Sequence, residues 1–344
     1  MSTPGLIVLM GSGETAPSGR ILHESAFRTL PIPVNVSIME TPAGFELNSS
    51  QVANRVSTFL EHRLQNYNPS ITVIPARRND SEFGTNNPDI LRPLLFADYI
   101  FMGPGSPSYA VRHLTGSLAW NMILARHHLG ACLAFSSSAA IAIGEIAAPI
   151  YEIYKVGEDP HWIPGLNLLG EFGLRIACVT HWNNTEGGVH LDTSRCFIGK
   201  SRITKLLSML PIGITLIGID EHTALMLDFS QSSCLVVGKG TVTLISGKKH
   251  QVFETGTSFD LSKLGTPRVP DTSDRIPTEV WADAIAANQT SNSSLPVEIE
   301  ALIAQREQAR NDKDWNKADS LRHQISDLGY TVVDTPNGPK WGAL

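Results

Sequence analysis

Short apolar runs alternate with amphipathic stretches across residues 1–264, and this alternation limits what the chain can fold into. The apolar runs predict buried strands of a parallel sheet, and the amphipathic stretches predict helices that cover its faces. The expected strands are residues 5–10, 34–39, 71–75, 97–102, 131–135, 174–180 and 215–218, followed by a β-meander at 225–228, 233–237 and 240–246. The expected helices include residues 50–67 and 108–129. The sequence therefore predicts an α/β fold with a parallel sheet flanked by helices.

The composition changes after residue 264. Residues 265–296 contain four prolines and a polar run at 288–294, which is too poor in apolar side chains to repay ordering. From residue 297 the apolar residues recur with helical periodicity, which predicts a helical hairpin whose second helix ends at Gly329. We therefore expect a domain at 1–264, a flexible linker at 265–296, and a small C-terminal module at 297–344.

Charge and cysteine usage exclude several classes of protein. The 27 Lys+Arg and 33 Asp+Glu residues give a net charge of −6, which offers no electrostatic footprint for tight, non-specific nucleic-acid binding. No apolar stretch is long enough for a membrane-spanning helix, and the N-terminus does not resemble a signal peptide. The four cysteines form no Cys-x-x-Cys pair, so we expect buried reduced thiols in a cytoplasmic protein.

Three consecutive serines, Ser136 to Ser138, follow an apolar run and precede small, helix-favouring residues. Such a transition is typical of a nucleophile elbow, in which a serine on a sharp strand-to-helix turn projects its hydroxyl above the sheet. We predict Ser138 as the nucleophile, with Ser136 and Ala140 at the flanking positions where the usual pattern has glycine. The alternative interpretation is a serine-rich loop that caps a helix and has no catalytic role.

A nucleophilic serine needs a base and an acid that orients the base. His181 ends the apolar run 176–180, and open α/β sheets bind their ligands at the carboxyl ends of strands. Glu221 and Asp220 are both available as the acid after another apolar run. A metal site is an alternative role for four residues whose spacing matches no compact ligand motif: His181, Glu186, His190 and Asp192. We expect neither a metal nor a cofactor.

Acyl transfer also requires N–H groups that stabilise an oxyanion. We predict that Ala139, directly after Ser138, supplies one of them. The loop Gly103-Pro104-Gly105 supplies the other, and Gly105 is the better donor because proline has no N–H. A simple turn is the alternative interpretation of this loop.

Taken together, these segments resemble the family of cyanophycinase and dipeptidase E, which are serine peptidases with a class I glutamine amidotransferase-like fold. The resemblance covers about residues 5–264 and rests on four ordered motifs: 101–106, 136–141, 165–169 with His181-Trp182, and 218–225. It implies that Ser138 is the nucleophile, His181 the base and Glu221 the third member of the triad. The implied reaction is amide hydrolysis of a small peptide, or of an Asp-containing or cyanophycin-like substrate, through an acyl-enzyme.

This chain departs from the family pattern at the elbow, where both glycines are replaced, and at Val179, where cyanophycinases usually carry an acid. Glutaminases of the same fold are a neighbouring possibility, but they use a Cys nucleophile and a His-x-Glu pair. Here Ser138 stands at the elbow and Asn183 lies two residues after His181. Glutaminase activity is therefore disfavoured.

About 45 residues of the tail resemble the end of bacterial cysteinyl-tRNA synthetases, a region that contributes to tRNA recognition. Matching positions include Ile303, Arg306, Arg310, Trp315, Asp319, Arg322, Gly329, Asp334, Gly338 and Trp341. Nothing before them resembles the synthetase catalytic domain, so aminoacylation is excluded. The module carries six Lys/Arg against eight Asp/Glu, which gives no long-range attraction for RNA. Two alternative interpretations therefore stay open. The tail is a hairpin that only packs or docks, or the whole chain is a catalytically silent protein whose tail binds tRNA or a protein partner. The sequence does not predict the oligomeric state.

Overall fold

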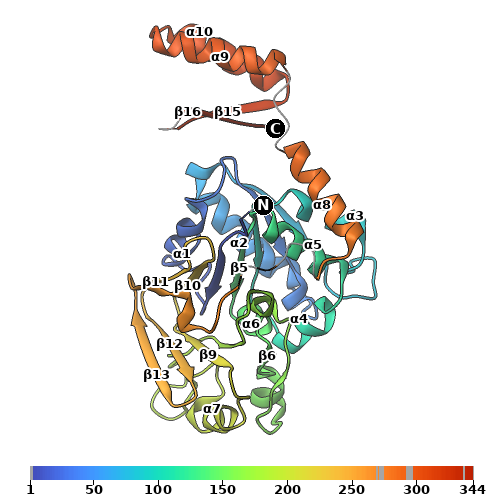
Figure 1. Cartoon of the computed structure of the whole chain (residues 1–344). Helices are drawn as coiled ribbons and strands as arrows, with labels where there is room; N and C mark the ends of the chain where they lie inside the picture. The colour runs from blue at the N-terminus through green and yellow to red at the C-terminus, as the bar shows by residue number, and fades with distance from the viewer. Residues whose placement is uncertain (1–2, 269, 271–274, 292–296, 336–337, 344) are drawn as a thin grey trace.

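The computed structural model describes residues 3–268, 270, 275–291, 297–335 and 338–343, and its main body is built on an eight-stranded sheet (Figure 1). The strand order is β14-β11-β10-β1-β5-β4-β2-β3. Its parallel part consists of β1 (Ile7–Met10), β5 (Cys132–Ser136), β4 (Tyr99–Met102), β2 (Asn35–Met39) and β3 (Ser70–Ile74). The predicted parallel sheet is confirmed, and β5 lies in its interior between β1 and β4.

Antiparallel strands extend this sheet beyond β1 and build a second sheet beside it. The extension consists of β10 (Thr223–Asp228), β11 (Ser233–Gly238) and β14 (Ser258–Asp260). The second sheet has the order β13 (Lys249–Glu254), β12 (Thr241–Ser246), β9 (Thr215–Ile219) and β8 (Ile176–Val179). The expected meander is therefore divided, because β12 pairs with β9 and β13 and not with β11. The chain changes sheets just after Gly238, whose φ of +123° few other residues adopt.

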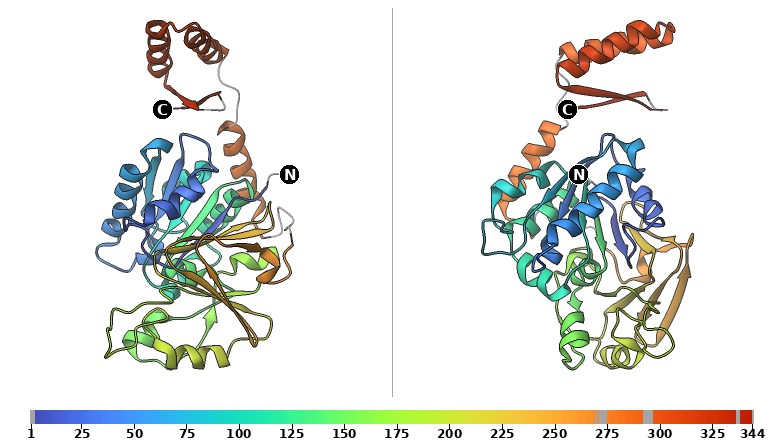
Figure 2. Two further views of the ribbon diagram at one scale, coloured as in Figure 1. Left: turned by 90° about the vertical axis from the view of Figure 1, so that its left-hand side faces the viewer. Right: turned by 180° about the vertical axis from the view of Figure 1, so that it is seen from behind.

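Helices cover both faces of the large sheet, and alternate side chains of β1 pack against the helices on opposite faces. Val8 and Met10 pack beneath α1 (Gly19–Phe27) and α2 (Ser49–Arg63). Ile7 and Leu9 face the opposite cluster, which includes α4 (Pro107–Leu114), α5 (Leu118–His128) and α6 (Ser138–Ala142). α7 (Gly199–Ser208) packs on the second sheet (Figure 2). The shorter elements are η1 (Thr41–Ala43), η2 (Gln65–Tyr67), α3 (Pro88–Leu91), η3 (Arg92–Phe96), β6 (Ile146–Ala147), η4 (Glu152–Val156), β7 (Ile163–Pro164), η5 (Leu168–Phe172) and η6 (Leu261–Lys263).

The single helix expected at 108–129 forms two helices, α4 and α5. Gly116 interrupts them with a φ of +68°, a left-handed conformation that ends a right-handed helix. Ser117 then begins α5, because its side chain accepts a hydrogen bond from the backbone N–H of Trp120 at 3.2 Å.

The expected linker contains a helix, α8 (Thr278–Ser291), that packs on the main body beside α5 (Figure 1). Val280 and Ala284 are buried on one face of α8, in the same core cluster as the large sheet. Arg126 of α5 donates a hydrogen bond to Asn288 Oδ1 at 3.0 Å. Prolines on both sides concealed this Ala-rich helix, whose sequence signal is apolar residues at i, i+4 spacing. Residues 269, 271–274 and 292–296 of the expected linker lie outside the described residues.

The predicted helical hairpin of the C-terminal module is confirmed as α9 (Val297–Asn311) and α10 (Trp315–Asp327). Gly329, with a φ of +83°, directly follows the C-cap residue Leu328. A β-hairpin that the helical pattern did not reveal follows, β15 (Tyr330–Thr335) and β16 (Gly338–Ala343). The hairpins share a small core of Ile299, Ile303, Ile325 and Val332. Within the described part of the chain, no helix is long and apolar enough to cross a membrane.

The packing of α8 predicts which C-terminal truncation leaves the main body stable. We expect a fragment of residues 1–291 to unfold at a higher temperature than a fragment of residues 1–270. Loss of α8 exposes the apolar surface beneath Val280, Ala284 and Trp281, so the thermal midpoint should fall by roughly 10 °C. Differential scanning calorimetry of the two fragments measures the difference, and equal midpoints would show that α8 contributes nothing to the body's stability.

Candidate active site

The chain makes a strained turn directly after β5, in the interior of the large sheet. Ser137 has φ +54° and ψ −117°, a conformation that residues with a side chain rarely adopt, and α6 begins at Ser138. The Ser137 N–H donates to Met10 O at the end of β1 at 3.1 Å. This strand–turn–helix arrangement is that of a nucleophile elbow, and it puts the Ser137 side chain at the carboxyl edge of the sheet.

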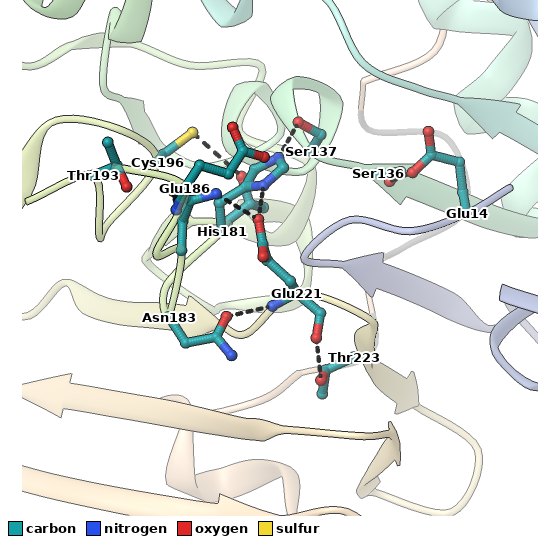
Figure 3. Close-up of polar contacts among 12 residues, drawn as sticks. Glu14, Ser136, Ser137, His181, Asn183, Glu186, Thr193, Cys196, Glu221 and Thr223 are labelled. Atoms are coloured by element: carbon teal, nitrogen blue, oxygen red, sulfur yellow. Dashed lines mark hydrogen bonds and ion pairs between the residues drawn. The ribbon is translucent and has the colours of Figure 1, made fainter. Parts of the chain in front are cut away.

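Two further strand ends bring an imidazole and a carboxylate to Ser137. His181 follows β8, and its Nε2 lies 2.9 Å from Ser137 Oγ (Figure 3). Glu221 follows β9, and its Oε1 lies 2.8 Å from His181 Nδ1. Hydroxyl, imidazole and carboxylate thus form one hydrogen-bonded chain, the geometry that lets a histidine deprotonate a serine.

The serine in this chain is one residue before the one we expected. Ser138 is buried in the first turn of α6, and its hydroxyl donates to Gly103 O at 3.2 Å, so it does not face His181. The Ser136 hydroxyl donates to Glu14 Oε2 at 2.8 Å. Successive residues around a tight turn point in different directions, so only one of three serines can reach the imidazole. A run of three serines without a flanking glycine gives no sequence signal for which one it is.

The structure distinguishes the two candidate acids. Asp220 accepts hydrogen bonds from the N–H and the hydroxyl of Thr241, at 2.8 and 2.9 Å, and so is used elsewhere. Glu221 accepts from His181 and also from Asn184 Nδ2 at 2.8 Å. These hydrogen bonds, that of His181 above all, hold the pKa of the Glu221 carboxyl below its ordinary value. Glu221 is therefore a carboxylate at neutral pH and stays hydrogen-bonded to the imidazole.

Asn183 and Asn184 are supporting residues that the sequence analysis did not identify. Asn183 Oδ1 accepts the backbone N–H of Glu221 at 2.8 Å, while Asn184 bonds the Glu221 side chain. They fix both the backbone and the carboxylate of the acid. Their position directly after His181-Trp182 was the available signal, because polar residues at a strand end commonly serve a site there.

A pocket of about 140 Å³ opens beside Ser137 and His181. Gly105, one predicted oxyanion donor, lines this pocket together with Ser137 and Ser138. Gly105 has φ +150°, and a Cβ added there would lie 1.9 Å from Pro42 O, so only glycine fits. Ala139, the other predicted donor, is buried in α6 one residue beyond Ser138. The N–H that directly follows the serine of the hydrogen-bonded chain is therefore that of Ser138.

Cys196 also lines the pocket, but its chemistry differs from that of the serine. Burial raises the pKa of its thiol to about 12, so the thiol stays protonated at neutral pH. Its sulfur lies 3.8 Å from Thr180 Oγ1. A protonated, buried thiol is a poor nucleophile, which again disfavours chemistry of the glutaminase kind.

The alternative metal set is not assembled by the fold. His181 is engaged by Ser137 and Glu221, and Asp192 accepts the N–H groups of Ser194 and Lys200 at 3.1 and 2.8 Å. Across the described ranges, no group of three or more His, Cys, Asp or Glu side chains is arranged to hold a metal ion.

Comparison with solved structures gives a likeness to the main body. The crystal structure of a peptidase from an acI-B1 Actinobacterium is 21% identical, with a TM-score of 0.59. The likeness covers 75% of this chain and 97% of that one. At this level of identity the likeness establishes the fold, so the expected α/β architecture is confirmed.

A separate set of relatives matches the tail. The family model described as the cysteinyl-tRNA ligase anticodon binding domain matches residues 292–341. The cysteine–tRNA ligase of Lactobacillus delbrueckii subsp. bulgaricus is 51% identical over 43 residues, which are 12% of this chain and 9% of that protein. That of Chlamydia abortus is 45% identical over 51 residues, 15% of this chain and 11% of that protein. The predicted tail resemblance is confirmed, and it spans about a tenth of each ligase.

The crowding at Gly105 predicts a position-specific effect on stability. We expect Gly105→Ala to lower the free energy of unfolding by about 2 kcal/mol or more, because the new Cβ collides with the backbone of Pro42. Gly103→Ala is the matched control, since its Cβ would meet the Phe101 ring edge at 3.0 Å and a small shift relieves that contact. Urea denaturation measures both variants, and equal losses would contradict the close approach at Gly105.

Proposed function

We propose that the main body is a serine-type peptidase that hydrolyses an amide bond of a small peptide or peptide-like substrate. The observation that carries the proposal is the hydrogen-bonded chain from Ser137 through His181 to Glu221, at the carboxyl ends of β5, β8 and β9. The shared fold with a protein described as a peptidase supports it. The free, buried cysteines are in keeping with the cytoplasmic location that we also propose.

In the proposed reaction Ser137 Oγ attacks the carbonyl carbon while its proton passes to His181 Nε2. The resulting oxyanion accepts hydrogen bonds from the N–H groups of Ser138 and Gly105. Ser138 thus takes the role of oxyanion donor that the sequence analysis gave to Ala139. His181 then protonates the leaving amine as the C–N bond breaks, which leaves an ester on Ser137. A water molecule, deprotonated by His181, attacks that ester and releases the acid, and the proton returns to Ser137 Oγ.

Glu221 acts through His181 in this scheme. Its carboxylate keeps the proton on His181 Nδ1, so that Nε2 is free to accept a proton from the serine. It also stabilises the imidazolium that forms during the attack. Asn183 and Asn184 hold Glu221 in place for both tasks.

Serine-directed labelling tests the assignment of the nucleophile. We expect a fluorophosphonate probe to label wild-type protein and to lose at least about a thousandfold in rate with Ser137→Ala, because a triad serine carries most of the catalytic effect. Ser138→Ala is the matched control: it removes one hydrogen bond to Gly103 O but should keep near-normal labelling. Mass spectrometry identifies the modified peptide, and labelling that survives Ser137→Ala but is lost with Ser138→Ala would return the role to Ser138.

The tail favours a second candidate function, tRNA binding, because its family match is to an anticodon-binding domain. However, two of its matching arginines are used within the module. Arg306 is buried and donates to both Asp334 carboxylate oxygens, at 2.8 and 2.9 Å, and Arg310 also pairs with Asp334. The exposed cations among the described side chains of α9, α10 and their connection are Lys313, Lys317 and Arg322. These three cations and the exposed aromatic residues Trp315 and Trp341 are described groups that an RNA could contact.

A mobility-shift titration with tRNA tests this second function. We expect a shift for the full chain and none for residues 1–291, with a shallow salt dependence because three cations displace few counterions. Lys317→Glu should weaken the complex several-fold, whereas Lys205→Glu, an exposed charge reversal on the main body, should not. If the full chain gives no shift at low salt, the module is a packing or protein-docking hairpin.

A further inference from the structure

The pocket beside Ser137 has an aromatic and aliphatic wall. Tyr154 and Phe197 stand together with ring centroids 5.5 Å apart, and the Phe197 ring lies 5.8 Å from the His181 ring. Ile150 and Tyr151 complete the wall. An apolar surface that touches the imidazole lies next to the bond that the proposed reaction breaks.

Phe197 of this wall lies on a turn that is hydrogen-bonded to the segment carrying His181. Arg195, Cys196 and Phe197 have successive φ values of +60°, +60° and +68°, a left-handed run that residues with side chains rarely adopt. The Cys196 N–H donates to His181 O at 3.2 Å, and the Arg195 N–H donates to Trp182 O at 3.3 Å. Residues with strained backbone conformations cluster at active sites and ligand-binding segments, so this turn is a candidate for substrate binding.

The charges around the pocket disfavour an acidic ligand. Burial, followed by the nearby Glu46 carboxylate, raises the pKa of Tyr151, so this wall residue is uncharged at neutral pH and cannot pair with an acidic ligand. Glu152 accepts a hydrogen bond from Ser108, and its Oε2 is buried without a hydrogen-bond partner among the described residues. The Lys155 ammonium lies 4.4 Å from the Tyr151 ring centroid but is exposed and is not part of the pocket lining.

We propose, resting on the proposed peptidase function, that this pocket binds an uncharged aromatic or branched aliphatic side chain next to the scissile bond. Such a side chain would bury its surface against Phe197, Tyr154 and Ile150, and aromatic pairs gain further energy from ring packing. Among the described lining residues there is no lysine, arginine, aspartate or glutamate, so a carboxylate or a guanidinium would be desolvated there without a permanently charged partner. The preferred substrate class is thus apolar, and not the Asp-containing class that the sequence resemblance implies.

Boronic acids, which add reversibly to an activated serine, test the preference on the full chain. The readout is protection of Ser137 from the fluorophosphonate probe by the boronic-acid analogues of phenylalanine, leucine, aspartate and arginine. We expect the phenylalanine or leucine analogue to protect at a concentration at least tenfold below the aspartate and arginine analogues, because the pocket rewards apolar burial. Lys155→Met should leave this order unchanged.

Phe197→Ala tests whether the wall sets the preference. We expect it to reduce the preference for phenylalanine over aspartate about tenfold while the probe still labels Ser137. Phe83→Ala is the matched control, because Phe83 is also a half-exposed aromatic residue but packs under Arg77 outside the pocket. Tyr154→Ala serves as a second wall variant if the thermal midpoint shows that Phe197→Ala is unfolded.

The outcomes separate this inference from the proposed function. Three results would overturn the apolar pocket alone, provided that the probe labels the wild-type enzyme. The charged analogues protect as well as the apolar ones, none of the analogues protects, or Phe197→Ala weakens protection by all of them equally. Failure of the probe to label any of Ser136, Ser137 and Ser138 in the wild-type chain would overturn the proposed peptidase function, and the apolar pocket with it.

Discussion

The candidate site depends on one strained residue, Ser137, at the end of a strand that is buried on both sides. Its backbone, with a positive φ, is unfavourable in isolation, so the surroundings must enforce it. β5 provides that enforcement because it is hydrogen-bonded to β1 and β4 and every residue in it is buried. The first turn of α6 packs into the same core and cannot shift to relieve the turn.

Long-range topology supplies the other groups. His181 and Glu221 follow adjacent strands of the second sheet, β8 and β9, while Ser137 follows a strand of the first. The two sheets meet where the His181 N–H donates to Gly11 O, just beyond β1, and where Gly11 has no room for a Cβ beside Asp220 O. The triad geometry is therefore a property of how two sheets join, and small residues at the junction make that joining possible.

Strand-end reasoning predicted His181, the Gly105 loop and an acid at Asp220 or Glu221, because buried apolar runs that stop at polar residues are visible in sequence. The family resemblance then selected Glu221. The serine register was not predictable in the same way, since three identical residues differ only in the backbone angles that the tertiary structure imposes. Helix α8 was concealed by flanking prolines. The strand-end position of Asn184 was visible, but its partner was not, because the acid that it bonds lies 37 positions away. In the tail, the helical period was clear, but the β-hairpin depends on contacts with Ile299 and Ile303.

The four cysteines are all free and buried, and burial raises the pKa of each thiol, to about 12 for Cys196 and Cys234. Thiols react with peroxides as thiolates, so these residues should oxidise slowly even though Cys196 borders the pocket. A cysteine at position 137 would carry the opposite liability, because an elbow nucleophile must be exposed and activated. With its four cysteine thiols buried, a chain that uses an oxygen nucleophile would keep its proposed site working under oxidative conditions that inactivate an enzyme with a thiol nucleophile.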